Sequence, residues 1–85
     1  MPYIKKDRRV DFEKALKDIK SRNIASAGEL NYIVSMLCKM YAESKDFNYQ
    51  VINDIIGALE CAKQEYIRRI VAGYEDTKIR TNGDI

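Results

Sequence analysis

The stretch that decides the fold is NYQVINDIIGALECAKQEYIRRIVAG, residues 48–73. Its apolar residues recur three and four positions apart, which is the spacing of one face of an α-helix. This face is formed by Ile52, Ile55, Ile56, Leu59, Ala62, Tyr66 and Ile70, with Val51 and Ala58 beside it. Asp46 or Asn48 can cap the start, and Gly73 fits the position that ends a helix. Gly57, in the interior, is expected to let a neighbouring helix approach closely. We therefore predict one long helix over about residues 48–73.

Two shorter helices are predicted before it. The spacing of Val10, Phe12, Ala15, Leu16 and Ile19 predicts a helix over about residues 10–22. Residues 28–43 carry two apolar stripes. One stripe holds Leu30, Ile33, Val34, Leu37, Cys38 and Tyr41, and the other holds Tyr32, Met36 and Met40. The predicted fold class is all-α: a single three-helix domain over residues 1–85, in which the second and third helices form a hairpin and the short first helix packs across it.

Residues 74–85 are predicted to be a structured C-terminal extension. Asn82-Gly83 is a strong turn signal, so we expect this segment to fold back against its own chain or a partner subunit.

The length of the third helix predicts self-association. Residues 49–72 as a helix would span about 36 Å, whereas a globule of this size has a radius of gyration of roughly 12 Å. Two short helices cannot cover both the long helix and the second apolar stripe of residues 28–43. We therefore expect a homo-oligomer, a dimer or higher, most simply built on a two-fold axis. The alternative is a monomer in which the tail supplies the extra cover.

Charge and hydropathy exclude several classes of function. The net charge is +2, with 15 Lys and Arg against 13 Asp and Glu, and the excess lies in residues 1–22. This balance is too weak for a nucleic-acid footprint, so nucleic acid is not expected as a partner. No apolar run reaches the roughly 18–20 residues that cross a membrane, and MPYIKKDRR lacks the apolar core of a secretory signal. We expect a cytoplasmic protein with no membrane partner.

Catalytic chemistry finds little support in the sequence. The chain has no histidine, which is the commonest general acid and base. Its two cysteines, Cys38 and Cys61, lie on or near apolar stripes and form no CxxC pair. Four scattered glycines do not make a phosphate-binding loop. We therefore expect no enzyme activity, no catalytic residue, no cofactor and no metal site.

Candidate binding residues gather at three places. The segment Asn48-Tyr49-Gln50, with Asn53 one turn on, places amides and a phenol at a helix N-terminus, where anions are favoured. A cap with solvated surface is the plainer interpretation. One of Arg68 and Arg69 can pair with Glu65, which leaves the other for a phosphate. The full candidate set is Tyr49, Asn53, Arg68, Arg69, Tyr74, Asp76, Lys78 and Asn82, with Arg9 from the basic start of the chain.

Four segments carry a family likeness: MPYIKKDRR, GELNYIV, NYQVINDIIGALECAKQEYIRRI and YEDTKIRTNGD. Together they resemble a family of small proteins of unsettled function found in phages, bacteria and archaea, over nearly the full chain. Related chains often have Ala-Pro before Tyr-Glu-Asp, where this one has Ala72-Gly73. In type, the chain is also similar to phage sponge proteins, which are small helical oligomers that sequester nucleotide immune signals. If the chain is phage-encoded, the compartment is the host cytoplasm.

The resulting functional hypothesis is a non-catalytic homo-oligomer that holds a small anionic, nucleotide-like ligand between subunits. A phage anti-defence sponge for a cyclic nucleotide or an ADP-ribose-type signal is one form of it. The alternative is a protein–protein interaction module that docks a host or virion protein through the surplus apolar faces. A DNA-binding protein is disfavoured because the charges of the long helix balance.

Overall fold

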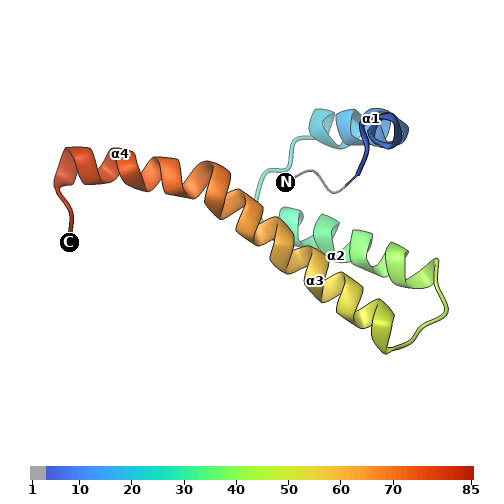
Figure 1. The fold of residues 1–85 in the computed structure, drawn as a ribbon. Helices are drawn as coiled ribbons and strands as arrows, with labels where there is room; N and C mark the ends of the chain where they lie inside the picture. The colour runs from blue at the N-terminus through green and yellow to red at the C-terminus, as the bar shows by residue number, and fades with distance from the viewer. Residues whose placement is uncertain (1–3) are drawn as a thin grey trace. The chain divides into compact units, whose positions relative to one another are not determined.

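The computed structural model describes residues 4–85, and this part of the chain is helical with no strand. Helix α1 spans Lys6–Ser21 and α2 spans Ala27–Glu43. The third segment runs without a break through α3 (Tyr49–Tyr66), a π-helical turn η1 (Ile67–Val71) and α4 (Ala72–Asn82), as Figure 1 shows. The all-α prediction with a long C-terminal helix is confirmed.

The chain divides into two compact units, one ending at Tyr41 and the other spanning Ala42–Ile85. Most of α2 belongs to the first unit, and the whole of the long helix belongs to the second. The single domain and the hairpin between the second and third helices stay predictions.

Helix α1 begins four residues before its predicted start at residue 10. Its first turn is held by the Lys5 carbonyl, which accepts from the N–H groups of Arg8 and Arg9 at 3.1 and 3.2 Å. Arg8 also pairs with Asp11, and its guanidinium lies 4.9 Å from the centroid of the Phe12 ring. Lys5, Arg8, Arg9 and Asp11 are charged and stabilise the first helical turn without apolar periodicity, so a stripe of hydrophobic residues does not predict this turn.

Helix α2 begins with a capping box. The Glu29 N–H donates to Ser26 Oγ at 3.1 Å, and the Glu29 carboxylate accepts from the Ala25 N–H at 3.3 Å. This is the Ser-x-x-Glu signature, in which two side chains satisfy unpaired N–H groups at a helix start. It explains why the helix begins at Ala27, one residue from the predicted position.

Helix α3 begins at a side-chain cap supplied by Asn48. Its Oδ1 accepts from the Val51 N–H at 3.1 Å, so Asn48 rather than Asp46 caps the helix. Val51 is 5% exposed and is the one residue of the described chain that counts as buried. The reason predicted for Gly57 is not seen, because a Cβ added there would meet no atom within 4 Å.

The predicted end of the long helix at residue 73 is wrong. An interior glycine costs only up to about 1 kcal/mol relative to alanine, which is too little to stop a helix with good hydrogen bonding on both sides. Helix α4 therefore passes through Gly73 and ends at Asn82. The glycine that ends it is Gly83, whose φ is 84° and whose N–H donates to the Ile79 carbonyl at 2.8 Å. The C-terminal extension is thus structured, but as helix through Asn82 rather than as a segment folded back from residue 74.

The π-helical turn changes which residues share a face. In this turn the Ala72 N–H donates to the Ile67 carbonyl, five residues back, so one extra residue fits into the turn. Each residue of an α-helix advances by about 100°, so everything after the turn is shifted by about that angle. Tyr74 therefore takes the place, on the face that contains Tyr66, that Gly73 would hold in an unbroken α-helix. The continuous segment has 34 residues and a length of about 51 Å.

Candidate functional site

The predicted site residues are spread along the long helix. Tyr49 and Asn53 lie in its first two turns, and Asn82 is its last residue. At 1.5 Å per residue, Tyr49 and Tyr74 are about 37 Å apart along the axis. Arg9 lies on α1, in the other unit. The long helix of one copy therefore does not gather its candidate residues into one pocket.

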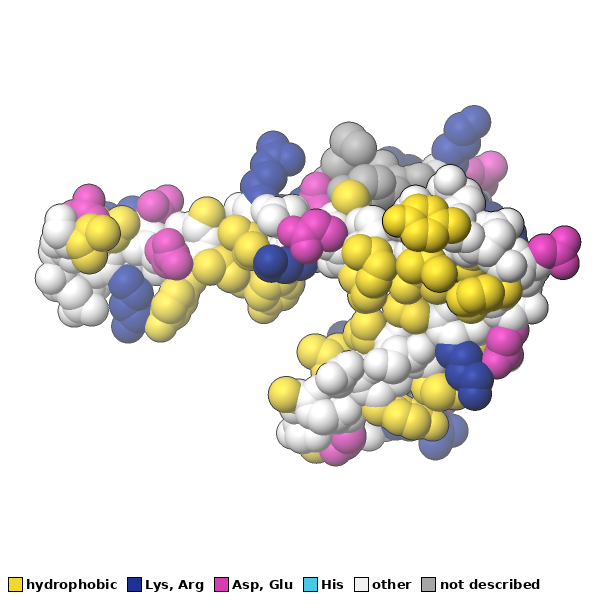
Figure 2. Space-filling view, turned by 90° about the horizontal axis from the view of Figure 1, so that it is seen from below, with side chains coloured by type: hydrophobic (Ala, Val, Ile, Leu, Met, Phe, Trp, Pro, Cys, Tyr) yellow, Lys and Arg dark blue, Asp and Glu magenta, His cyan; other side chains and the backbone are white. Residues whose placement is uncertain are grey.

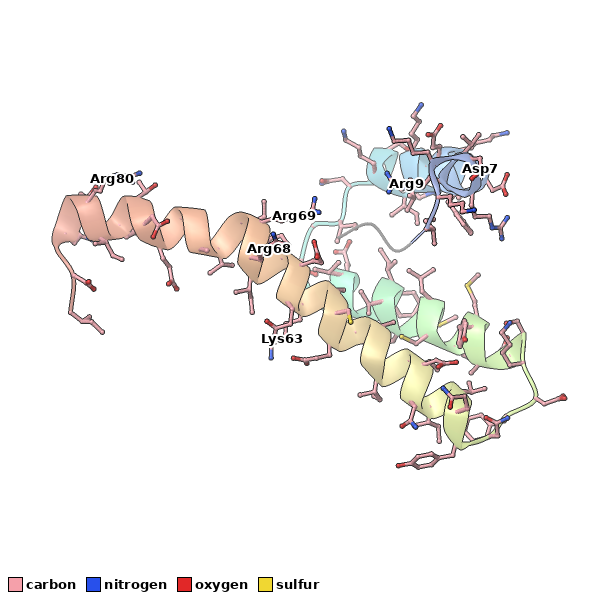
Figure 3. The ribbon with its side chains drawn as sticks, viewed as in Figure 1. Asp7, Arg9, Lys63, Arg68, Arg69 and Arg80 are labelled. Atoms are coloured by element: carbon pink, nitrogen blue, oxygen red, sulfur yellow. The ribbon has the colours of Figure 1, made fainter. Side chains whose placement is uncertain are left out.

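The two arginines lie in the π-helical turn. Arg69 Nε is 2.7 Å from Glu65 Oε2, so Arg69 is the arginine that pairs with Glu65. Arg68 makes no ion pair with any residue in the range 4–85 and keeps its guanidinium for another partner. Figure 3 shows both arginines on the long helix between Lys63 and Arg80. Consecutive residues of a helix diverge by about 100°, so the two side chains leave it in different directions.

The C-terminal turns bring two candidates together. Lys78 Nζ lies 5.4 Å from the centroid of the Tyr74 ring, within the range of a cation–π interaction. Lys78 and Asn82 also line a shallow hollow, together with Glu75, Ile79, Gly83, Asp84 and Ile85. The carboxylates of Glu75 and Asp84 would oppose an anion there, so this hollow alone is a poor phosphate site. Asp76 is exposed and does not line it.

The N-terminal turns leave a phenol ring open to solvent. Tyr49 is 76% exposed, which leaves its ring free to stack on a planar partner. Two neighbouring amides are already engaged, since Asn48 caps the helix and Gln50 Nε2 donates to Asp54 Oδ1 at 2.8 Å. Tyr49 and Asn53, which lie one turn apart, are the groups of this segment best placed to meet a ligand.

A regular apolar stripe, which we call the seam, runs along the exposed side of the long helix. Its members are Ile52, Ile56, Leu59, Lys63, Tyr66 and Ile70. Successive members are separated alternately by four and three residues, which is the a/d spacing of a coiled coil. The five apolar members are between 39 and 62% exposed. In Figure 2, hydrophobic side chains, in yellow, are exposed over much of the face in view.

One charged residue interrupts the seam near its middle. Lys63 Nζ lies 3.8 Å from Glu60 Oε1, and Glu60 also accepts a hydrogen bond from Gln64 Nε2 at 3.0 Å. A lysine at a single a position typically fixes the register and the number of helices in a coiled coil, at a cost in stability. The stripe predicted from the sequence contains the five apolar members of the seam together with Ile55 and Ala62, and it leaves out Lys63, so the seam was not recognised. The strict alternation of four and three was the signal that could have found it.

Metal and membrane sites find no support in the described residues. No three His, Cys, Asp or Glu side chains in residues 4–85 are grouped so that they could hold a metal ion. Both thiols are free, with Cys38 half-buried and Cys61 exposed. None of the described helices combines the length and the apolar character needed to cross a bilayer.

Comparison with known proteins places the chain in a family. The model of the family described as "Domain of unknown function (DUF6899)" matches residues 1–85. The chain belongs to this family. No curated protein and no solved structure matches it.

The membership in DUF6899 agrees with the small family that the sequence resembles, and its description carries no activity. What this DUF6899 chain can bind therefore depends on the chemistry of its own surface. Two features of that surface are chemically specific. The seam is suited to pairing with another helix, and the phenols and guanidinium groups at its two ends are suited to a planar ring and to phosphate oxygens.

Proposed function

We propose that this protein is a non-catalytic homo-oligomer whose long helices associate along the seam and hold a small anionic, nucleotide-like ligand between subunits. The observation that carries the proposal is the exposed seam itself. Five large apolar side chains in strict a/d spacing lie open on one side of a single 34-residue helix.

Association is favoured because burying such side chains is favourable. Removing one large aliphatic or aromatic side chain from water contributes about 1.5–3 kcal/mol. Part of this gain is offset by the loss of translational freedom and of side-chain rotamers. Each copy exposes five such side chains in one row, which is more contiguous apolar surface than a monomer usually leaves in water. Contiguous apolar patches of this kind mark interaction sites.

The ligand proposal rests on the chemistry at the two ends of the seam. Tyr49 and Tyr74 offer rings that can stack on a base. Arg68 offers a planar fork of donors that fits a phosphate bidentately. Because about 37 Å of helix separates Tyr49 from Tyr74, a ligand that contacts both ends needs more than one copy. A phage anti-defence sponge for a cyclic nucleotide or an ADP-ribose-type signal is the biological form of this proposal.

Two measurements test it. Sedimentation velocity over a range of concentrations is expected to show a dimer or a larger species. Isothermal titration against a panel of cyclic nucleotides and ADP-ribose derivatives is expected to show binding by at least one compound. Absence of binding tighter than about 1 mM across the panel would contradict the ligand part of the proposal.

A matched pair of variants identifies the phosphate contact. Arg68→Gln is expected to weaken binding of the ligand found in the panel, because the planar donor fork is lost. Arg80→Gln removes the same charge from α4 at a position six residues after Tyr74, beyond the proposed site, and is expected to leave binding unchanged. Equal weakening by both variants would point to a general effect of charge rather than to a site at Arg68.

A second candidate function is a protein–protein interaction module, and one observation favours it. The second stripe of α2 is open to solvent: Tyr32 is 65% and Met40 59% exposed, with Met36 between them. Methionines adapt to irregular partner surfaces. In this case Met40→Glu is expected to abolish binding of a purified host or virion partner and to leave self-association through the long helix unchanged.

A further inference from the structure

The seam is symmetric about residue 61. Leu59 and Lys63 lie two positions from it, Ile56 and Tyr66 lie five positions from it, and Ile52 and Ile70 lie nine positions from it. The six members therefore form three pairs whose partners would lie level with each other in two antiparallel copies related by a two-fold axis at residue 61. A two-fold interface uses one surface patch twice, so it requires this kind of self-complementarity.

We propose that the partner of the seam is a second copy of this chain, antiparallel to the first, with the two-fold axis crossing the long helix at residue 61. This inference rests on the proposed self-association and gives it a register. Ile52 of one copy then packs in a layer with Ile70 of the second copy, and Ile56 packs with Tyr66. Each such layer joins an a position to a d position.

Charge separates this arrangement from a parallel one. In a parallel pair in register, Lys63 would lie beside Lys63 of the second copy, and two like charges would meet in the apolar seam. In the antiparallel pair, Lys63 lies level with Leu59 of the second copy and next to its Glu60. Each lysine keeps the ion pair with Glu60 of its own chain, which measures 3.8 Å in the single chain, and gains the Glu60 carboxylate of the second copy. The two lysines and two glutamates then balance one another at the axis.

The same register joins the separated halves of the ligand site. Asn53 lies eight residues before the axis, so it comes level with Arg69 of the second copy, one residue from Arg68. Tyr49 lies twelve residues before the axis, level with Gly73 of the second copy. The π-helical turn puts Tyr74 on the seam face at that level.

Each end of the pair thus offers two phenol rings and one amide at the seam, whereas Arg68, two residues after Tyr66, lies on the outer side of the same helix and has no ion pair within residues 4–85. The two rings and the amide suit a ligand with a planar base, and there are two equivalent sites for each pair of chains. The distance between the two halves of the site in one copy is the reason that the site is incomplete without the second copy.

Disulfide cross-linking tests the register. In a background that carries Cys38→Ser and Cys61→Ser, an Ile52→Cys chain mixed with an Ile70→Cys chain of different mass is expected to give the mixed disulfide as the main product. Disulfides need Cα atoms within about 7 Å, so only residues of one layer can join. Ala62→Cys, one residue from the axis, is expected to cross-link to itself. Self-linked Ile52→Cys or Ile70→Cys as the main product would overturn the antiparallel register and leave the oligomer standing.

A pair of charge variants tests the seam without relying on cysteine. Ile56→Glu places a carboxylate in a seam layer and is expected to weaken self-association at least about tenfold, because two apolar side chains are lost from each pair. Gln64→Glu adds the same charge one residue outside the seam, where it replaces the donor to Glu60, and is expected to weaken self-association much less than Ile56→Glu. Circular dichroism confirms that each variant keeps its helical content. A wild-type chain that sediments as a monomer at high concentration would overturn both the register and the proposed oligomer, whereas cross-linked pairs that bind no ligand would overturn the composite site alone.

Discussion

The Oδ1 atom of Asn48 accepts a hydrogen bond from the N–H of Val51 at 3.1 Å, and Val51 is the residue with the least exposed side chain in the described chain. The cap and the burial coincide in the first turn of the long helix. The start of that helix is therefore fixed twice, once by a polar contact and once by an apolar one. The far end has a cap and no buried residue, so we expect the helix to fray from the C-terminus.

The first prediction concerns this cap. Asn48→Ala leaves the Val51 N–H without its side-chain acceptor and is expected to destabilise the protein by about 1 kcal/mol. Asn48→Asp keeps an acceptor at the same place and is expected to cost much less. The free energy of unfolding in urea measures both. Equal loss in the two variants would show that the side-chain oxygen is not the stabilising feature.

The second prediction concerns Gly57. It lies inside α3, and a Cβ added there would meet no atom within 4 Å. Gly57→Ala is therefore expected to stabilise the protein by up to about 1 kcal/mol, because alanine loses less backbone freedom on folding. The residue lies outside the seam, so the sedimentation coefficient should not change. A destabilised variant would indicate that another chain packs against this position in the oligomer.

The third prediction concerns the end of the helix. Gly83 has φ 84° and ψ 156°, a region of backbone conformation that is essentially restricted to glycine. Gly83→Ala is expected to strain this turn by about 1–3 kcal/mol and to fray the last turn of α4. Amide hydrogen exchange should then be faster near Thr81 and unchanged near Val51. Faster exchange along the whole helix would instead mean that the C-terminal end supports the rest of the structure.

The fold class could be predicted from the sequence, and the end of the long helix could not. The 3.6-residue periodicity of the apolar residues from Ile52 to Ile70 indicates a helix over that stretch. It says nothing about residues 72–82, where charged and polar side chains follow Tyr74 and no apolar stripe exists. Either Gly73 or Gly83 could be the glycine that follows the last residue of the helix. Local sequence does not choose between them, because an interior glycine is tolerated at a modest cost.

The candidate site shows the same limit. Residue type alone pointed to Tyr49, Arg68 and Tyr74 as binding groups, and the pairing of one arginine with Glu65 was predicted and is seen for Arg69. The distances between Tyr49, Arg68 and Tyr74 depend on whether residues 74–85 fold back or continue the helix, and residue type does not decide this. The π-helical turn also had no signal in the sequence, and it is this turn that moves Tyr74 onto the face of the seam.

The fourth prediction concerns Lys63, the charged member of the seam. Lys63→Leu removes the charge and supplies an apolar side chain to the layer that contains Leu59 of the second copy. We expect self-association to become roughly tenfold tighter or more, since about 1.5–3 kcal/mol accompanies the burial of each leucine. We also expect the orientation to become less specific, because the lysine no longer disfavours a parallel pair.

The two effects have separate readouts. Sedimentation equilibrium gives the dissociation constant, and the cysteine pair Ile52→Cys with Ile70→Cys reports the orientation. In the Lys63→Leu background, self-linked products are expected beside the mixed disulfide. Gln64→Leu adds the same side chain one residue outside the seam and should change neither the affinity nor the pattern of products. An unchanged dissociation constant for Lys63→Leu would place this residue outside the interface, since a leucine buried between two helices cannot leave their affinity as it was.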